Sequence, residues 1–365
     1  MNKPTRQFDE KLSPFLRLKL EELHATFGPG SQQYLGLARQ YLRDDREALE
    51  GLENNVKHYE AGLEVESHGE ALHGMERLYR HTIVIEPTFV CAAHCRYCLR
   101  SHYPRHTLTE AQITEIAKFC GAPERRDEVN EVLITGGDPL MIPKRLNFLI
   151  EALLEHAPNV RTFRIGSRLM TQYPQKVDDA VFAVFRNKPE VRFEIATQIS
   201  HPVEFFPETC AIFKRVRDLG IKIYSQNVLL KGVNDDIDTL VRLYDLMRVH
   251  DLEPHYLFHC VPMRGIHHLR TSVDTGIRLI RQLVMGGLIS GRAKPMFAAM
   301  TDIGKITFYE GVIRARRDGW LLLQSQYRMA DRLAHNPSWV LPANAEVDGD
   351  GLLRVWYLDG SDEPA

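Results

Sequence analysis

The stretch from residue 82 to residue 98, TIVIEPTFVCAAHCRYC, joins an apolar run to three closely spaced cysteines. Their spacing is C-x3-C-x2-C, formed by Cys91, Cys95 and Cys98. Three thiolates on one tight loop suit a cuboidal [4Fe-4S] cluster and leave its fourth iron open to a small molecule. A zinc site would need a fourth ligand; the nearest histidines, His94 and His102, belong to no second paired motif. Incidental buried thiols are the remaining alternative.

The composition is that of an ordinary globular enzyme. The chain has 365 residues, 44% hydrophobic and 26% charged, with a net charge of -2, so neither nucleic acid nor an anionic membrane is implied as a partner. No apolar run approaches the ~20 residues of a membrane span, and the N-terminus lacks a signal-peptide core. We therefore expect a cytoplasmic protein. The remaining cysteines, Cys120, Cys210 and Cys260, are too scattered for a disulfide framework and are expected in the core.

Working outward from the cysteine loop, β-rich runs alternate with amphipathic helical stretches. The predicted strands are Thr82–Glu86, Glu131–Thr135, Thr162–Gly166, Val191–Thr197, Ile221–Leu230 and Pro254–Cys260. The predicted helices between them are Thr109–Cys120, Pro143–His156, Val177–Arg186, Pro207–Leu219 and Ile237–His250. Six β/α units predict an α/β fold with a parallel sheet and right-handed crossovers. Because six units are two short of a closed barrel, we expect a partial (β/α)6 barrel over residues 79–299.

The two segments that flank this core have a different pattern of predicted elements. Residues 1–78 are predicted as an N-terminal helical cap without strands, built from helices at Pro14–Phe27, Ser31–Leu42 and Asp45–Gly62. Residues 300–365 are predicted as a C-terminal extension of short strands and loops that ends in a frayed polar tail, SDEPA.

Polar and glycine residues gather where the predicted strands end. They include Gly136-Gly137-Asp138, the segment Gly166-Ser167-Arg168, Gln198, His201 and Gln226. The loops at the C-terminal ends of parallel strands carry function, so these residues predict one pocket together with the cysteine loop. Two glycines after a strand let the backbone approach a ligand closely, although in isolation they indicate no more than a tight turn.

The cysteine motif, with Tyr97 just before its last cysteine, resembles that of the radical S-adenosylmethionine (SAM) superfamily. Six ordered segments over roughly residues 77–310 are, more narrowly, similar to the lysine 2,3-aminomutase family. They are CRYCLRSHYPRH, LITGGDPLM, RIGSR, TQISHPVE, QNVLLKGVNDD and GIHHLRT. The resemblance implies a [4Fe-4S] cluster held by the three cysteines, SAM, and pyridoxal 5'-phosphate (PLP). It places SAM against Gly136, Gly137 and Asp138; Tyr97, His201 and Gln226 are the further cofactor candidates.

The resemblance also implies roles around PLP and the substrate. Arg100 matches the arginine that pairs with the substrate carboxylate, which a guanidinium grips with two hydrogen bonds. Lys305, in MTDIGKITFYEG, aligns with the lysine that carries PLP as a Schiff base. Here the chain keeps Gly304 and loses the other glycines of the family segment, so a surface lysine stays the alternative, and Lys294 is the other lysine considered. Arg77, Tyr79 and Arg80 are predicted to hold the PLP phosphate.

Two departures from the family concern zinc and the substrate. No cysteine follows Cys260, so we expect no C-terminal zinc site of the kind the lysine enzymes have. The carboxylates that hold a lysine ammonium in the family correspond to Val261 and Ala298, which makes free lysine a poor substrate.

Taken together, these motifs predict a radical SAM, PLP-dependent amino-acid 2,3-aminomutase acting on an amino acid other than lysine, with catalytic residues Lys305 and Arg100. One alternative is a PLP-independent radical SAM isomerase, dehydrogenase or decarboxylase, and another is a non-catalytic iron–sulfur redox or sensing protein. The expected partners are a small-molecule amino acid and an electron donor such as flavodoxin or ferredoxin. The sequence leaves the oligomeric state open, a homo-oligomer included.

Overall fold

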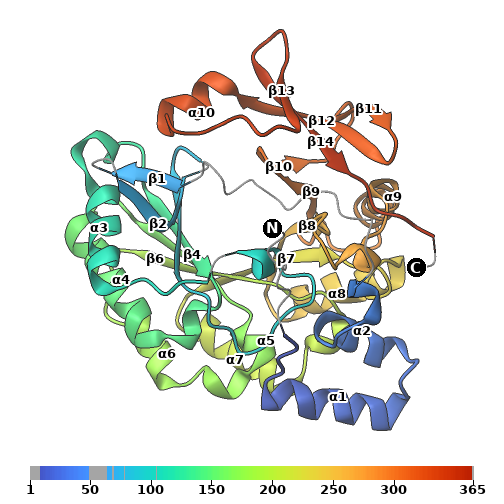
Figure 1. Ribbon diagram of the computed structural model, residues 1–365. Coiled ribbons are helices and arrows are strands. Elements are labelled where there is room, and N and C mark those ends of the chain that lie inside the picture. Colours follow the sequence, from blue (N-terminus) through green and yellow to red (C-terminus); the bar gives the residue numbers. More distant parts are fainter. Residues whose placement is uncertain (1–8, 49–63, 68–69, 78, 104, 364–365) are drawn as a thin grey trace.

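The computed structural model describes residues 9–48, 64–67, 70–77, 79–103 and 105–363. Its centre is a ten-stranded sheet with the strands in chain order from β1 to β10 (Figure 1). Seven consecutive strands run parallel: β3 (Thr82–Thr88), β4 (Glu131–Gly136), β5 (Thr162–Gly166), β6 (Arg192–Thr197), β7 (Lys222–Leu229), β8 (Glu253–His259) and β9 (Met296–Thr301). Within the described ranges the order does not close on itself. The predicted α/β partial barrel is therefore confirmed.

The six predicted strands correspond to β3–β8, and the seventh parallel strand, β9, was not predicted. Its sequence, MFAAMT, has a single β-branched residue, Thr301, and follows a segment rich in glycine, LVMGGLISGRAKP. Helix α9 (Val273–Met285) supplies the crossover that precedes it. The predicted boundary at residue 299 consequently falls inside a strand of the barrel.

Helices cover the outer face of the barrel (Figure 1). They are α3 (Glu110–Gly121), α4 (Pro143–His156), α6 (Asp179–Val184), α7 (Pro207–Asp218), α8 (Ile237–Val249) and α9, with the short α5 (Leu169–Gln172) after β5. Side chains alternate along a strand. In β4 and β5, Val132, Ile134, Phe163 and Ile165 are fully buried in the main core cluster. Arg164, on the opposite face, lines an internal cavity.

The N-terminal segment begins with the predicted helices, α1 (Pro14–Phe27) and α2 (Gln32–Tyr41), each capped by a serine side chain, Ser13 and Ser31. A short 3-10 turn, η1, follows at Asp45–Ala48; residues 49–62 of the third predicted helix lie outside the described residues. The prediction of a cap without strands is wrong for its last part, which contains β1 (Glu64–Ser67) and β2 (Glu70–Glu76). Strand β2 pairs antiparallel with β3, and β1 pairs antiparallel with β2.

The C-terminal segment adds one strand to the barrel and forms a second sheet. Strand β10 (Gly304–Thr307) pairs antiparallel with β9. The four-stranded sheet then contains β11 (Ile313–Arg317), β12 (Trp320–Arg328), β14 (Leu352–Leu358) and β13 (Ala345–Val347) in that order, with α10 (Met329–His335), at the top of Figure 1.

The prediction of a frayed C-terminal tail is wrong for the described part of that tail, which ends at residue 363. The Asp362 carboxylate accepts hydrogen bonds from the backbone N–H of Ser272 at 2.9 Å and from the Thr275 hydroxyl at 3.1 Å. These bonds hold the tail against the N-terminal end of α9. None of the helices in the described parts of the chain is long and apolar enough to cross a membrane.

Candidate active site

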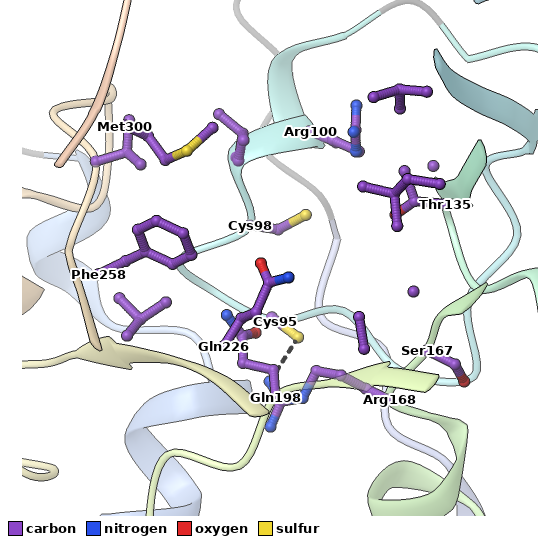
Figure 2. Close-up of a pocket in the computed structure, with 18 of the residues that line it drawn as sticks. Cys95, Cys98, Arg100, Thr135, Ser167, Arg168, Gln198, Gln226, Phe258 and Met300 are labelled. Atoms are coloured by element: carbon purple, nitrogen blue, oxygen red, sulfur yellow. Dashed lines mark hydrogen bonds between the residues drawn. The ribbon is translucent and has the colours of Figure 1, made fainter. Parts of the chain in front are cut away.

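A cavity of about 360 Å³ lies inside the barrel and brings most of the predicted site residues together (Figure 2). The predicted residues that line it are Tyr79, Cys91, Cys95, Tyr97, Cys98, Arg100, Gly136, Gly137, Asp138, Gln226 and Lys305. The exceptions are Arg77, Arg80 and His201. The seven parallel strands all deliver their C-terminal ends to one edge of the sheet, which is why residues so distant in sequence meet here.

The N-terminal segment holds the cysteine loop through hydrogen bonds to the main chain of the loop. Lys11 Nζ donates to the Cys91 carbonyl at 2.6 Å, and the His94 N–H donates to the Lys11 carbonyl at 2.9 Å. The Arg96 N–H donates to the carbonyl of Gln40 on α2 at 2.8 Å. Residues far upstream of the barrel thus fix the loop that carries the thiols.

The three cysteines suit an iron–sulfur cluster as a donor set. All three are free thiols and line the same cavity, and soft thiolates are the donors that such clusters take. Burial raises the pKa of Cys98 to about 12, and the neighbouring thiol of Cys95 adds to this rise. In this conformation, no three His, Cys, Asp or Glu side chains of the described residues converge as metal ligands. Cys95 Sγ accepts hydrogen bonds from the side chains of Arg168 and Gln172.

The glycine pair packs the end of β4 against the chain that leads into the cysteine loop. Gly136 has φ +100°, a conformation that favours glycine. A Cβ on Gly137 would lie 2.6 Å from the Val90 carbonyl oxygen. The N–H groups of Gly137 and Asp138 donate to the carbonyls of Thr88 (2.6 Å) and Val90 (2.8 Å). The glycines therefore fix the position of the cysteine loop, whatever ligand they also contact.

The Asp138 carboxylate connects the ends of β4 and β5. It accepts hydrogen bonds from Ser167 Oγ at 2.8 Å and from the backbone N–H groups of Arg168 and Leu140 at 2.9 and 3.1 Å. Burial raises its pKa to about 6, although these hydrogen bonds oppose the rise. Because protein donors occupy the carboxylate, the predicted SAM contact of Asp138 stays a prediction.

His201 lies away from the cavity. Its Nδ1 accepts a hydrogen bond from the Val203 N–H at 3.1 Å and caps the short turn η6 (Pro202–Glu204). Its ring packs against Gly36 of α2, where a Cβ would lie 2.5 Å from the imidazole carbon. Burial lowers its pKa to about 4. The geometry gives its assignment as a SAM contact no support and fits a packed strand-end residue instead.

The two arginines predicted for the PLP phosphate also face away. Arg77 Nη2 donates to Glu128 Oε2 at 2.6 Å, and Arg80 Nε lies 3.5 Å from Glu128 Oε1. Neither side chain lines the cavity. Tyr79, predicted with them, does line it, so that only one member of the predicted set is in place.

Lys305 extends from β10 into the cavity. Its amine lies 5.2 Å from the ring centroid of Tyr256, 5.7 Å from that of Phe258 and 5.9 Å from that of Tyr79. Loss of water around the amine and, to a lesser extent, the nearby charge of Arg164 lower its pKa to about 8. The Tyr327 hydroxyl donates to the Lys305 carbonyl at 2.9 Å and holds the hairpin in place. Lys294, the other lysine considered, is exposed and outside the cavity.

Three arginines line the cavity, and each has a carboxylate partner. Arg100 forms an ion pair with Glu86, whose pKa burial raises to about 7. Arg164 Nη1 donates to Glu131 at 2.7 Å. Arg168 Nη2 donates to Glu204 at 2.8 Å.

Arg168 was predicted to lie in the pocket, but neither it nor Arg164 was assigned a chemical role from the sequence, although both belong to the quoted segment RIGSR. The available signal was their position: Arg164 falls on the inward face of a strand, and Arg168 follows its C-terminal end. Both are places where an arginine faces the interior of the barrel.

The residues that replace the family carboxylates offer no charge. Val261 lines the cavity, whereas Ala298 is fully buried and does not. Asp302, near Ala298 in sequence, accepts a hydrogen bond from Asn344 Nδ2 at 2.7 Å and does not line the cavity either.

Comparison with known proteins agrees with this geometry. The model of the radical SAM superfamily matches residues 85–244, which carry the cysteine loop and strands β4–β7. Over this segment the chain resembles radical SAM proteins. It is 32% identical to a putative L-lysine 2,3-aminomutase of Aquifex aeolicus over 64% of this chain and 62% of that relative.

Two further relatives have the same chemistry in their names. The L-lysine 2,3-aminomutase of Methanococcus maripaludis is 31% identical over 57% of this chain and 47% of its own length. The glutamate 2,3-aminomutase of Clostridioides difficile is 28% identical over 60% of this chain and 51% of its own. The predicted resemblance of the chain to the lysine 2,3-aminomutase family is confirmed. The match spans less than two thirds of each of these relatives.

Proposed function

We propose that this chain is a radical SAM, PLP-dependent 2,3-aminomutase of an amino acid other than lysine. The observation that carries the proposal is that Lys305 shares one cavity with Cys91, Cys95 and Cys98. An isomerisation initiated at SAM and completed on a lysine-bound cofactor needs both sites to face one substrate.

When bound, the cluster would supply an electron that cleaves SAM to a hydrogen-abstracting radical, and PLP would supply a ring that delocalises spin. Lys305 would hold PLP covalently, and its lowered pKa favours the neutral amine that such attachment needs. Tyr79, Tyr256 and Phe258 surround this amine with rings and keep water from it.

Arg100 is proposed to orient the substrate through its carboxylate. It lines the cavity, in which its guanidinium is already paired with Glu86. A substrate carboxylate would share or replace this partner, as the raised pKa of Glu86 allows that residue to become neutral. The reductant, a flavodoxin or ferredoxin, is likewise a proposal.

For the PLP phosphate, Arg164 is a better assignment than Arg77 or Arg80. It lines the cavity, and its charge acts on the Lys305 amine. Arg77 and Arg80 pair with Glu128 and do not line the cavity, which favours the second function considered, a radical SAM enzyme without PLP.

One labelling experiment distinguishes the two. Incubation with PLP followed by borohydride reduction should attach a pyridoxyl group to the peptide that contains Lys305, detected by mass spectrometry. Lys305→Ala should lose the label and keep its iron, while Lys294→Ala, a change at an exposed lysine, should keep both. Labelling at Lys294 would move the site, and no specific label on either lysine would favour the PLP-free enzyme.

A further inference from the structure

We infer that Arg168 is a positioning residue that sets the reduction potential of the cluster through a hydrogen bond to the sulfur of Cys95, with Glu204 opposing its charge. The inference rests on the proposed function, because it presupposes a cluster held by the three cysteines. It concerns residues outside the cysteine motif.

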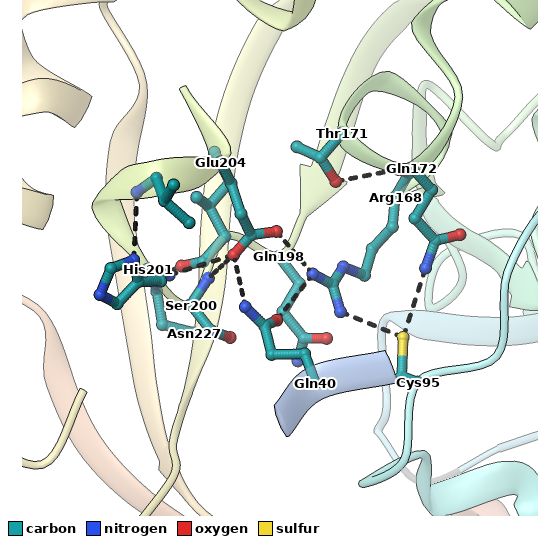
Figure 3. Close-up of polar contacts among 12 residues, drawn as sticks. Gln40, Cys95, Arg168, Thr171, Gln172, Gln198, Ser200, His201, Glu204 and Asn227 are labelled. Atoms are coloured by element: carbon teal, nitrogen blue, oxygen red, sulfur yellow. Dashed lines mark hydrogen bonds and ion pairs between the residues drawn. The ribbon is translucent and has the colours of Figure 1, made fainter. Parts of the chain in front are cut away.

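The contact is direct (Figure 3). Arg168 Nη1 donates to Cys95 Sγ at 3.0 Å, and Gln172 Nε2 donates to the same sulfur at 3.3 Å. Arg168 follows β5, and Gln172 lies one helical turn later on α5. The short turn after β5 thus directs two donors at one thiol.

The guanidinium is fixed in place by partners from three other parts of the chain. Its Nη2 donates to Glu204 Oε2 at 2.8 Å and to Oε1 of Gln40 on α2 at 3.1 Å. Its Nη1 also donates to the Tyr97 hydroxyl at 2.5 Å. Glu204 in turn accepts from Gln40 Nε2 at 3.0 Å and from the Ser200 N–H at 2.8 Å.

This network is withdrawn from water. The side chain of Arg168 is 10% exposed and that of Glu204 is 2% exposed. Charges act more strongly in such surroundings than at a surface. A network serving only to pack the strand ends would not need to direct donors at a sulfur atom.

The direction in which Arg168 shifts the reduction potential follows from its positive charge. A [4Fe-4S] cluster gains one electron on reduction, so its thiolate sulfurs become better acceptors. A donor with positive charge therefore stabilises the reduced form and raises the potential, and hydrogen bonds to the sulfurs are a known determinant of cluster potential. The carboxylate of Glu204 acts in the opposite direction. The electron comes from the external reductant, and Arg168 itself exchanges neither an electron nor a proton.

The test is a redox titration of anaerobically reconstituted full-length protein, monitored by the paramagnetic signal of the reduced cluster. Arg168→Met should lower the ratio of reduced to oxidised cluster at least tenfold at a fixed ambient potential, a shift of about 59 mV for one electron. Glu204→Gln should raise the ratio, and Gln172→Leu should lower it by less than Arg168→Met. Arg168→Lys, which keeps the charge and loses the fork, should lie between wild type and Arg168→Met.

Arg164→Met is the matched control, since it removes another arginine that lines the same cavity. The guanidinium of Arg164 donates to Glu131 and Tyr224 rather than to a sulfur. Its potential should stay near that of the wild type. Equal potentials in wild type, Arg168→Met and Glu204→Gln would overturn the inference, as would an equal shift in Arg164→Met. If Arg168→Met does not fold, the direction of the shift in Glu204→Gln decides. A wild-type protein that binds no cluster would refute the proposed function instead.

Discussion

Lys305 is the residue whose pKa bears most directly on the proposed reaction. Its pKa falls from 10.5 to about 8 because the amine has lost water and lies near Arg164. The neutral amine, which attacks the PLP aldehyde, therefore becomes the major form as the pH rises through about 8. We predict that the initial rate of pyridoxyl labelling of Lys305 rises to half its maximum near pH 8 and levels off above pH 9.

The control for this prediction is a blocked lysine in free solution, whose labelling should keep rising to beyond pH ~10. Mass spectrometry of the Lys305 peptide across pH 6 to 10.5 provides the measurement. A profile for Lys305 that follows the blocked lysine would mean that the amine is solvated.

Single residues were predicted unevenly from the sequence. The three cysteines and the glycine pair belong to motifs that follow predicted strands, whereas Lys305 was assigned through the resemblance to the aminomutase family. All of them line the cavity. His201, Arg77 and Arg80 also follow or precede strands, but their side chains have partners elsewhere, in Val203 and Glu128. A side chain's direction depends on packing between distant elements, which motif spacing does not encode.

At the scale of elements, the turn after β4 determines where the cysteine loop lies. Gly137 approaches the backbone of Phe89 and Val90 so closely that a methyl group would lie 2.6 Å from it. We predict that Gly137→Ala lowers the free energy of unfolding by roughly 1–3 kcal/mol, the usual cost of overpacking, and also lowers iron content. Thermal unfolding and iron analysis measure the two effects.

Gly291→Ala is the matched control, because a Cβ at Gly291 would have no neighbour within 4 Å. Its unfolding free energy should stay within about 0.5 kcal/mol of the wild type. Equal stability and equal iron content in the two variants would show that the close approach at Gly137 is unimportant.

The elements themselves were predicted well where hydrophobic periodicity is strong. Helices α1 and α4 begin and end at the predicted residues, and β3–β8 match six predicted strands. Strands β1, β2 and β9 were missed because their sequences, EVES, EALHGME and MFAAMT, are rich in glutamate or alanine, which are depleted in strands. Pairing with a neighbouring strand stabilises them, and this is a tertiary effect.

At the scale of the whole molecule, the charged side chains of the cavity limit which amino acids can be substrates. The carboxylates that line the cavity, Glu76 and Asp138, already have partners. Arg100 Nη1 lies 4.0 Å from Glu76 and is also paired with Glu86. Asp138 accepts a hydrogen bond from Ser167 Oγ at 2.8 Å. Val261, at a position where the family has a carboxylate, offers only packing. A desolvated ammonium without a partner costs several kcal/mol. We therefore predict that L-lysine is converted at least ~100-fold less efficiently, in kcat/KM, than the best neutral or acidic amino acid.

An amino-acid panel with mass-spectrometric detection of β-amino products tests this discrimination. Val261→Asp should improve the use of lysine, and Val261→Asn, which is similar in size and uncharged, should not. Lysine turnover equal to that of the best substrate would contradict the prediction. So would a folded, cluster-containing Val261→Asp variant with no gain in lysine binding.

The claim on which the whole account depends is that the cysteine loop holds a cluster that cleaves SAM. The most direct measurement is iron content together with 5'-deoxyadenosine formation, after anaerobic reconstitution and reduction with dithionite in the presence of SAM. The wild type should hold about four irons per chain and form 5'-deoxyadenosine. Replacing Cys91, Cys95 or Cys98 by Ala should abolish both, while Cys120→Ala and Cys260→Ala should retain both. A triple alanine variant of the loop that kept its iron and still cleaved SAM would contradict the account, as would a wild-type cluster that never produced 5'-deoxyadenosine.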